Sequence, residues 1–536
     1  ITIVAAIRVA VHFLWNILST ILEGVIGSIQ QTKIKKYFVS KIYTKMTEID
    51  MRQYENSDYY SKLSRAIQQA EDRPIWLLGS IRQLCSTFFT LLGLFATLFW
   101  LSPLSVLVSF LGGFVTFLVY YINSKLEYHY YVDKAECQRI FDYIKRIFYM
   151  PKYKYDIHYF NITPAFLEKD HDNTLKLCSV IKKHTPKILF LKTSTTILSV
   201  GINMGFASFF VVWQILNGEL RIGDFSAAIA AISALGNCLF SFGMTFPQFK
   251  EHSYAINDYL DILNSQSDLY NVGGIDISNE KLQNLEFKNV SFSYFGNGKT
   301  IDNLSFSLKK GEKVALVGRN GAGKTTFLKL LLKLYSAEEG IISYNEIPYS
   351  KINTKSLYSV FSPMFQTTNS YAFSIKENIL FAKDRKESEV SVNSTEIRTI
   401  IKKAGLWDKV SSLENQENTM LVSEINDRAI ELSGGETQKL GIARVMFRGK
   451  DIIVMDEPTA ALDPLSEEAL YKVIEEMPRD KTLVIVSHRL SCVKNMDRIL
   501  YFENGNIVED GNHLELMKKN GKYASMFRLQ ASRYGA

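Results

Sequence analysis

Residues 318–326 form a glycine-rich segment of a kind that binds phosphate. The segment follows a short apolar strand predicted at 314–317 and precedes a helix predicted from Phe327 to Leu334. Its residues are Gly318, Arg319, Asn320, Gly321, Ala322, Gly323, Lys324, Thr325 and Thr326. Glycines let backbone amides approach phosphate oxygens, and the N-terminus of a helix adds positive potential. The pattern predicts a P-loop in which Lys324 meets the β- and γ-phosphates and the Thr325 hydroxyl binds Mg²⁺.

Two adjacent carboxylates follow a second predicted apolar strand at 452–455. We expect Asp456 to hold Mg²⁺ directly or through water, and Glu457 to act as the general base for an attacking water. Alone, such a pair would more often cap the end of a strand. Together with a P-loop, it indicates hydrolysis of a nucleoside triphosphate.

A second cluster of small residues precedes a helix predicted from Thr437. It comprises Leu432, Ser433, Gly434, Gly435 and Glu436. Small residues before a helix N-terminus can also bind phosphate, yet the chain already has a P-loop. The second cluster therefore indicates a second nucleotide face, and hence a working unit that contains two such domains.

These motifs make residues 283 to about 530 similar to the ABC ATPase family, whose signature is Leu-Ser-Gly-Gly-Gln. The resemblance implies that Tyr294 stacks on the adenine of ATP, and that Gln366 contacts Mg²⁺ and the transmembrane side. It also identifies Asp463 as the D-loop aspartate and His488 as the switch histidine that acts with Glu457.

The family further implies that two domains face head to tail. Each ATP would then lie between one P-loop and the partner's Ser433, Gly434, Gly435 and Glu436. Glu436 replaces the usual glutamine, Lys439 stands where arginine is common, and Ala460 replaces a frequent serine. None of these departures removes a catalytic group.

The N-terminal half contains five apolar stretches long enough to cross a bilayer. They lie near residues 2–28, 76–100, 103–122, 187–216 and 223–246. The long connections between them carry many lysines, so the positive-inside rule places these connections in the cytoplasm. Five spans with a cytoplasmic C-terminus would put residue 1 outside. We therefore expect a sixth span upstream of residue 1.

The two long connections, 30–73 and 123–187, are predicted to continue as helices beyond the membrane, because structureless loops of that length are rare. Each has a break at which a helical hairpin could turn. The breaks lie at 54–58 and at 150–164. By resemblance to exporters, the coupling helices that touch the ATPase domain fall in these two regions.

Composition excludes several other classes. The net charge of +7 is spread among mixed charges, and no basic block with interleaved aromatics predicts nucleic-acid binding. The five cysteines are isolated and form neither a zinc pattern nor a disulfide framework.

We predict an α-helical transmembrane domain at 1–265, a linker at 266–282 and an α/β P-loop ABC ATPase domain at 283–536. The chain resembles exporter-type half-transporters, near bacterial peptide or bacteriocin exporters. The resemblance implies multi-pass insertion in a bacterial cytoplasmic membrane, contact with membrane lipid, and ATP hydrolysis with Mg²⁺ coupled to export of a peptide or another amphiphile. The expected partner is a second half-transporter, as a homodimer in preference to a heterodimer. A lipid flippase or multidrug exporter remains an alternative. A soluble ABC ATPase is disfavoured by the five apolar stretches.

Overall fold

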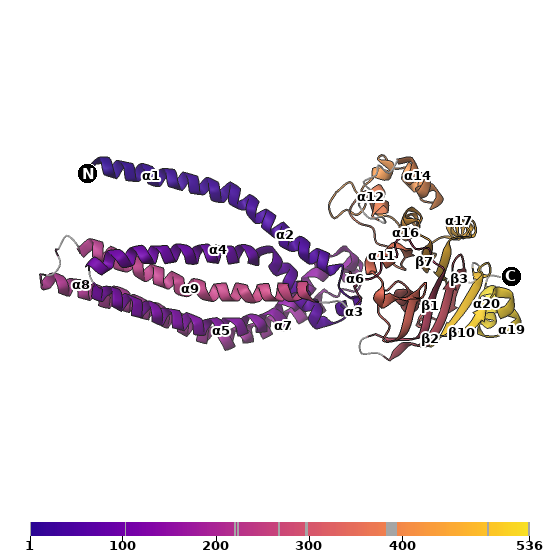
Figure 1. Cartoon of the computed structure of the whole chain (residues 1–536), viewed down its shortest axis with the longest axis horizontal. Coiled ribbons are helices and arrows are strands. Elements are labelled where there is room, and N and C mark those ends of the chain that lie inside the picture. Colours follow the sequence, from indigo (N-terminus) through magenta and orange to yellow (C-terminus); the bar gives the residue numbers. More distant parts are fainter. Residues whose placement is uncertain are drawn as a thin grey trace. The chain divides into compact units, whose positions relative to one another are not determined.

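The structure is a computed structural model that describes residues 2–101, 103–218, 221, 225–265, 269–294, 298–381, 394–489 and 493–533. It divides into two compact units. The helical unit comprises Ile1–Met46 and Ser61–Ser265, and the α/β unit comprises Thr47–Tyr60 and Gln266–Ala536. Each unit is described by itself below, with the element labels of Figure 1.

The helical unit consists of long helices joined by short connections. Its elements are α1 Thr2–Ile21, η1 Leu22–Gly27, α2 Ser28–Met46, α4 Ser57–Leu101, α5 Pro103–Tyr149, η2 Pro151–Tyr153, α6 Lys154–Tyr159, α7 Thr163–Val200, η3 Gly201–Phe206, α8 Ala207–Leu216 and α9 Phe225–Asn264. The predicted breaks are present, because α2 ends at Met46 before α4 begins, and α5 ends at Tyr149 before α7 begins. Residues 219, 220 and 222–224, which lie between the fourth predicted stretch and the start of α9, are outside the described residues.

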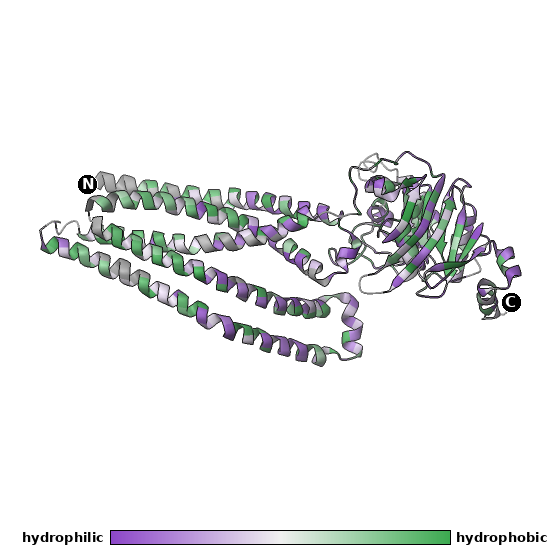
Figure 2. Cartoon of the chain, turned by 60° about the horizontal axis from the view of Figure 1, so that its bottom comes forward, coloured by the Kyte–Doolittle hydropathy of each residue, from purple (hydrophilic) through white to green (hydrophobic). Residues whose placement is uncertain are grey.

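Helix α5 packs along α7 and α9 (Figure 1). A buried apolar cluster that includes Val106, Val211 and Ile232 joins α5, α8 and α9. Gly113 of α5 permits the close approach of α9, because a Cβ atom there would lie 2.8 Å from Leu239 Cδ1. In Figure 2, hydrophobic residues gather in the part of these helices that is far from η2 and α6. Near η2 and α6, hydrophilic residues prevail.

Three helical segments among the described residues are long and apolar enough to cross a membrane. They are Gln69–Ala96, Val106–Tyr149 and Phe225–Thr245. These segments overlap the second, third and fifth predicted stretches. The first stretch lies in the continuous run of α1, η1 and α2, and the fourth in the run of α7, η3 and α8. The total number of spans stays a prediction.

The α/β unit contains two sheets. The six-stranded sheet has the order β10, β9, β3, β8, β7, β6, and all neighbouring pairs are parallel except β10 with β9. Its strands are β3 Lys313–Gly318, β6 Phe361–Met364, β7 Ile452–Asp456, β8 Thr482–Val486, β9 Arg498–Glu503 and β10 Asn506–Gly511. The antiparallel sheet has the order β2, β1, β4, β5. Its strands are β1 Asn284–Ser293, β2 Lys299–Lys309, β4 Glu339–Tyr344 and β5 Ile347–Pro348.

The helices of this unit flank the sheets. They are α3 Met51–Tyr54, α10 Lys324–Leu331, η5 Tyr349–Lys351, α11 Thr354–Ser359, α12 Ile375–Leu380, α14 Ser394–Lys403, α15 Trp407–Ser411, η6 Gln416–Asn418, α16 Gly434–Arg448, α17 Pro464–Glu475, α19 His513–Lys519 and α20 Lys522–Arg533. Phe327 of α10 is fully buried between the sheets. Its ring stacks on Phe287 of β1 at 4.9 Å and contacts Phe502 of β9 at 5.5 Å, so one side chain joins both sheets to the P-loop helix.

Two predicted helix starts were wrong by three residues. Helix α10 begins at Lys324 because Gly323, with φ of +103°, takes the N-cap position. Helix α16 begins at Gly434 because the Ser433 side chain caps it.

Candidate functional site

The predicted site residues converge on the carboxyl edge of the six-stranded sheet. Gly318 ends β3, and Asp456 ends β7. His488 follows the end of β8, which lies between these two strands, and Gln366 follows β6 on the other side of β7. In open α/β sheets, ligands bind outside the carboxyl ends of parallel strands. The strand order therefore brings together four residues that are far apart in sequence.

The P-loop has the backbone that a phosphate cradle requires. Gly318 has φ of +146°, and a Cβ atom there would lie only 2.3 Å from the Phe502 carbonyl oxygen. Only glycine fits this position. The loop leads into the N-terminus of α10, where Lys324 is 5% exposed. The Lys324 ammonium donates to the carbonyl oxygens of Gly318 and Arg319, both at 2.9 Å.

Charge also links this lysine to the carboxylates. Burial lowers the pKa of Lys324 below its usual value, while nearby Glu457 and Asp456 act in the opposite direction. An anionic ligand beside the ammonium would favour its charged form in the same way.

Asp456 fits the role of a Mg²⁺ ligand. Its side chain is 5% exposed, and its Oδ1 has no hydrogen-bond partner among the described residues. The Thr325 hydroxyl donates to the carboxylate. Burial raises the pKa of Asp456, and the Thr325 hydrogen bond partly offsets that rise. An orphaned carboxylate oxygen beside a hydroxyl is the hard oxygen set that Mg²⁺ prefers.

Glu457 is held in a strained conformation next to this position. Its φ of +49° is unusual for a residue with a side chain, and strain of this kind clusters at functional sites. Its Oε1 lies 2.7 Å from His488 Nε2, and its Oε2 accepts a hydrogen bond from Gln366 Nε2 at 3.3 Å. The three side chains thus form one hydrogen-bonded group.

The signature segment opens helix α16. The Ser433 hydroxyl accepts from the Glu436 backbone amide at 3.3 Å, and the Glu436 carboxylate accepts from the Ser433 amide at 2.8 Å. This is a capping box. A Cβ atom on Gly435 would lie 3.1 Å from the Ala461 carbonyl oxygen, so the segment packs closely on the loop before Asp463. Asp463 itself caps α17, and hydrogen bonds from Ser466 lower its pKa.

Tyr294 follows β1 and reaches the P-loop helix. Its hydroxyl lies 3.2 Å from the Thr326 hydroxyl and accepts from Lys329 Nζ at 3.2 Å. Its ring meets Tyr335 edge to face at 5.5 Å. The Tyr294 side chain thus lies beside the P-loop helix, and its stacking on adenine stays a prediction.

Sequence reasoning missed several residues around the site. Lys329 lies over the rings of both Tyr294 and Tyr335, at 5.1 and 5.3 Å. Gln438 Oε1 accepts from the Ala461 amide at 2.9 Å, and Gln530 Nε2 donates to the His488 carbonyl at 2.7 Å. These residues belong to no motif, and only the fold brings them to the site.

The segment Thr47–Tyr60 belongs to the α/β unit and contains the first predicted break. Asp50 caps the short helix α3 by accepting from the Arg52 amide at 2.8 Å. Arg52 pairs with Glu338 at 2.8 Å, and Glu55 accepts from the Tyr335 hydroxyl at 2.6 Å. Burial and then the Glu55 bond raise the pKa of Tyr335 above its usual value. Two rings in edge-to-face contact, Tyr335 and Tyr294, therefore connect this segment to the P-loop.

Comparison with known proteins agrees with this geometry. Residues 301–460 match the family model described as ABC transporter. The chain is 28% identical over 492 residues to the subtilin transport ATP-binding protein SpaT of Bacillus subtilis. The aligned region is 91% of this chain and 78% of SpaT. It is 31% identical to an ATP-dependent lipid A-core flippase of Methylobacillus flagellatus, over 62% of this chain and 54% of that protein.

Two further matches bear on length and fold. The chain is 30% identical to ATP-binding cassette sub-family B member 6 of Rattus norvegicus, over 70% of this chain but only 43% of that relative. The chain thus spans less than half of that protein. A solved structure of a bacterial Atm1-family ABC exporter with ATP bound superposes with a TM-score of 0.79 at 20% identity, covering 97% of this chain and 88% of that one. Residues 301–460 thus match the ABC transporter family, and the chain is similar in sequence to transport proteins of that family and in fold to one of its exporters.

Proposed function

We propose that the chain is one half of a dimeric exporter that hydrolyses ATP to move a peptide or another amphiphilic substrate across the cell membrane. The observation that carries this proposal is the convergence of the P-loop, Asp456, Glu457 and His488 on one sheet edge. We further propose the domain division 1–265, 266–282 and 283–536, with the ATPase domain in the cytoplasm of a bacterial cell.

The side chains have distinct roles in hydrolysis. The amides of 318–323 and the Lys324 ammonium bind the phosphates, and Tyr294 stacks on the adenine. Glu457 accepts a proton from water, whose oxygen attacks the γ-phosphorus as the bond to the β,γ-bridging oxygen breaks, giving ADP and phosphate. His488 orients Glu457 through the 2.7 Å contact. Thr325, Asp456 and Gln366 would hold Mg²⁺, which neutralises charge on the phosphate oxygens when bound.

The signature segment serves the ATP of a second chain. Ser433, Gly434, Gly435 and Glu436 stand at the N-terminus of α16, where the helix dipole favours an anion. The Ser433 hydroxyl already caps its own helix, so the segment is formed before a nucleotide arrives. Asp463 would sit at the same interface. A homodimer has two such composite sites.

The choice of cargo rests on the relatives. SpaT is named for subtilin transport, which favours a peptide, whereas the Methylobacillus relative is named a lipid A-core flippase. SpaT matches over 91% of this chain and therefore over most of the helical unit, while the flippase matches over 62%. We therefore favour a peptide, with lipid or drug export as the alternative.

The test of the proposed function is Glu457→Gln in the full chain. We expect ATP binding to be retained while hydrolysis falls by about 100-fold or more, because the amide cannot take the proton. Glu468→Gln is the matched control, because Glu468 is an exposed carboxylate on α17. We expect the Glu468→Gln chain to hydrolyse ATP at the wild-type rate. Undiminished hydrolysis in Glu457→Gln would refute the assignment of the base.

A further inference from the structure

The C-terminal helix α20 contacts the backbone of His488, although the two are distant in sequence. Gln530 Nε2 donates a hydrogen bond to the main-chain carbonyl oxygen of His488 at 2.7 Å, across a separation of 42 residues. His488 Nε2 in turn lies 2.7 Å from Glu457 Oε1. Gln530 therefore bonds to the same residue whose ring contacts the proposed general base.

Helix α20 is itself fixed on the α/β unit (Figure 1). Glu509 of β10 accepts a hydrogen bond from the Tyr523 amide near the start of the helix, at 3.0 Å. Tyr523 is fully buried, and its hydroxyl lies 2.8 Å from His513 Nδ1 of α19. Phe527, one turn further on, packs against the apolar core of the unit. Residues 523, 527 and 530 share one face of the helix, so the packing of that face also places Gln530.

The residues on either side of His488 are held by other contacts. The Ser487 hydroxyl accepts from the Arg489 amide and donates to the Arg489 carbonyl oxygen, both at 3.0 Å. The Arg489 guanidinium pairs with the Glu467 carboxylate of α17. The bond from Gln530 adds a contact to the peptide unit between His488 and Arg489. It restricts rotation of that unit, and hence the direction in which the His488 side chain leaves the backbone.

The contact between His488 and Glu457 needs such restriction. The His488 side chain is 37% exposed, so packing of the ring leaves it room to move. Beta-strand β8 ends at Val486, and its ladder therefore does not hold residue 488 directly. Hydrogen bonds weaken steeply when their angle or distance departs from the ideal, and a displacement of about 1 Å is enough to lower a reaction rate strongly.

We propose that Gln530 is a positioning residue for ATP hydrolysis, which keeps the imidazole of His488 within hydrogen-bond distance of Glu457 by holding the His488 main-chain carbonyl. In this role Gln530 touches neither the attacking water nor a phosphate. Its loss should therefore lower the rate of hydrolysis and leave ATP binding, which depends on the P-loop, nearly unchanged. This inference rests on the hydrolysis proposed above and adds one residue to it.

The test is a double-mutant cycle between Gln530→Met and His488→Ala, with ATPase rates measured on the full chain in phosphatidylcholine nanodiscs. Methionine has about the length of glutamine but no N–H donor. We expect Gln530→Met to lower kcat about 10-fold and to change the KM for ATP by less than about 2-fold. In the His488→Ala chain the same substitution should lower kcat by less than about 2-fold, because no imidazole is left to position.

Two further variants at the same position vary the donor. Gln530→Glu also lacks an N–H donor and should lower kcat at least as much as Gln530→Met. Gln530→Lys keeps a donor, because an ammonium can reach the same carbonyl, and should hold kcat within about 3-fold of the wild type. Leu529→Met is the matched control, since it places methionine at the neighbouring position of α20, where the side chain is 60% exposed. It should hydrolyse ATP at the wild-type rate.

Three results would overturn the proposal. They are a wild-type kcat in both donor-free variants, a kcat in Gln530→Lys as low as in Gln530→Met, and an equal loss from Gln530→Met in the wild-type and His488→Ala chains. The last result would mean that Gln530 supports the fold of the unit without acting through His488.

The parent chains of the cycle separate this inference from the function on which it rests. A wild-type chain that hydrolyses ATP, with a slow His488→Ala chain and a fast Gln530→Met chain, contradicts only the role of Gln530. A wild-type chain that fails to hydrolyse ATP under all conditions contradicts the exporter function itself.

Discussion

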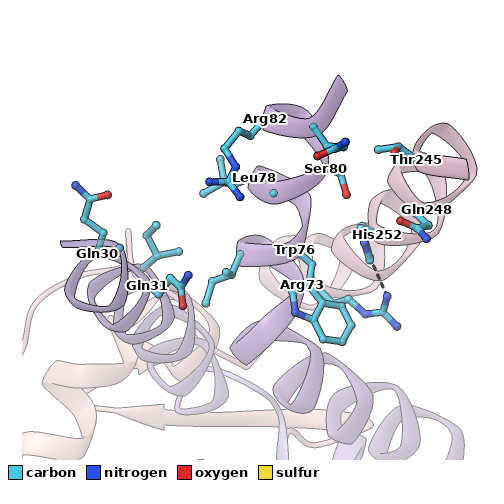
Figure 3. Close-up of a pocket in the computed structure, with 15 residues that line it drawn as sticks. Gln30, Gln31, Arg73, Trp76, Leu78, Ser80, Arg82, Thr245, Gln248 and His252 are labelled. Carbon is cyan, nitrogen blue, oxygen red and sulfur yellow. Dashed lines mark hydrogen bonds between the residues drawn. The ribbon is translucent and has the colours of Figure 1, made fainter. Parts of the chain in front are cut away.

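The carboxyl edge of the six-stranded sheet and the cavity of the helical unit place their polar side chains in different ways. At the sheet edge, Asp456 is the last residue of β7, Glu457 follows it, and His488 lies just beyond β8. These strands are hydrogen-bonded to each other, so register fixes the backbone at their ends. In the cavity, which is the pocket between α2, α4 and α9 (Figure 3), polar side chains such as Arg73 and Gln248 project from the faces of long helices. A strand end leaves little freedom, whereas a helix face can exchange one side chain for another without altering the backbone.

This difference predicts how each region tolerates substitution. Each residue at the sheet edge has a separate task and a fixed position, so a single change should remove activity. Several cavity residues would contact the same ligand, so a single substitution there should change the affinity for that ligand only moderately. The four predictions below test or refine this contrast, from the largest expected effect to the smallest.

Lys324→Ala should weaken ATP binding by about 100-fold or more, because the ammonium is the buried cation of the P-loop. Binding of a fluorescent ATP analogue to the purified full chain measures the effect. Lys472→Ala, an exposed lysine on α17, is the control and should bind as the wild type does. A Lys324→Ala chain that keeps its ATP affinity would show that the sheet edge is as tolerant as we expect the cavity to be.

Tyr335→Phe should loosen the segment Thr47–Tyr60, because it removes only the hydroxyl that donates to Glu55 and keeps the ring that packs on Tyr294. We expect trypsin to cleave after Arg52 about fivefold faster, as a bond to a charged acceptor is lost at a partly exposed site. Tyr344→Phe is the control, because the Tyr344 hydroxyl bonds to the Glu280 carbonyl and not to this segment. Equal cleavage in both variants would mean that the Glu55 contact does not hold the segment.

Lys333 should make the stability of the α/β unit depend on pH. Burial lowers its pKa from the usual 10.5 to about 8, so between these values the unfolded chain binds more protons than the folded chain. The contribution of uncharged Lys333 to the free energy of unfolding is complete above pH 10.5 and is lost as the pH falls through 8. From pH 7 to 9 the free energy of unfolding should therefore rise by about 1 kcal/mol.

Denaturant unfolding at both pH values, followed in the wild type and in Lys333→Met, isolates this contribution. The variant lacks the titrating group and should show a smaller rise. An equal rise in both chains would assign the pH dependence to other groups.

Glu436→Gln should change the ATPase rate by less than about 2-fold. Glutamine is the residue that the family signature has here, and its side-chain oxygen can accept from the Ser433 amide as the carboxylate does. Glu436→Ala should cost about 1 kcal/mol of stability, because it opens the capping box. Steady-state ATPase rates and thermal unfolding of both variants measure the two effects. A large loss of rate in Glu436→Gln would show that the carboxylate has a role beyond the cap.

The sequence predicted the sheet edge more fully than the cavity for a physical reason. P-loop and carboxylate motifs are local, and short apolar strands before them indicate where each one ends. The contact of Glu457 with His488 needs only that β7 and β8 be neighbours. By contrast, long stretches of chain separate Gln30, Arg73 and Gln248. No local sequence pattern indicates that the helices carrying them pack together.

Tertiary packing also explains the other residues that sequence reasoning missed. Lys329 lies beside Tyr294 because α10 passes the end of β1, and Gln530 reaches the His488 carbonyl from the C-terminal helix α20. The two helices begin three residues before their predicted starts because their N-cap residues, Gly323 and Ser433, lie inside the motifs. In the helical unit the breaks were predictable from local sequence, but the packing of α5 on α9 through Gly113 was not.

The central claim is that each ATP lies between the P-loop of one chain and the signature segment of another, and cysteine cross-linking tests it most directly. The five native cysteines are first replaced by serine or alanine. One chain then carries Asn320→Cys and its partner carries Ser433→Cys, both with Glu457→Gln to retain ATP. We predict that Mg²⁺, ATP and an oxidant give a covalent dimer of the two chains, and that neither variant alone forms it. A monomer band under all conditions, or equal cross-linking without ATP, would contradict the composite site.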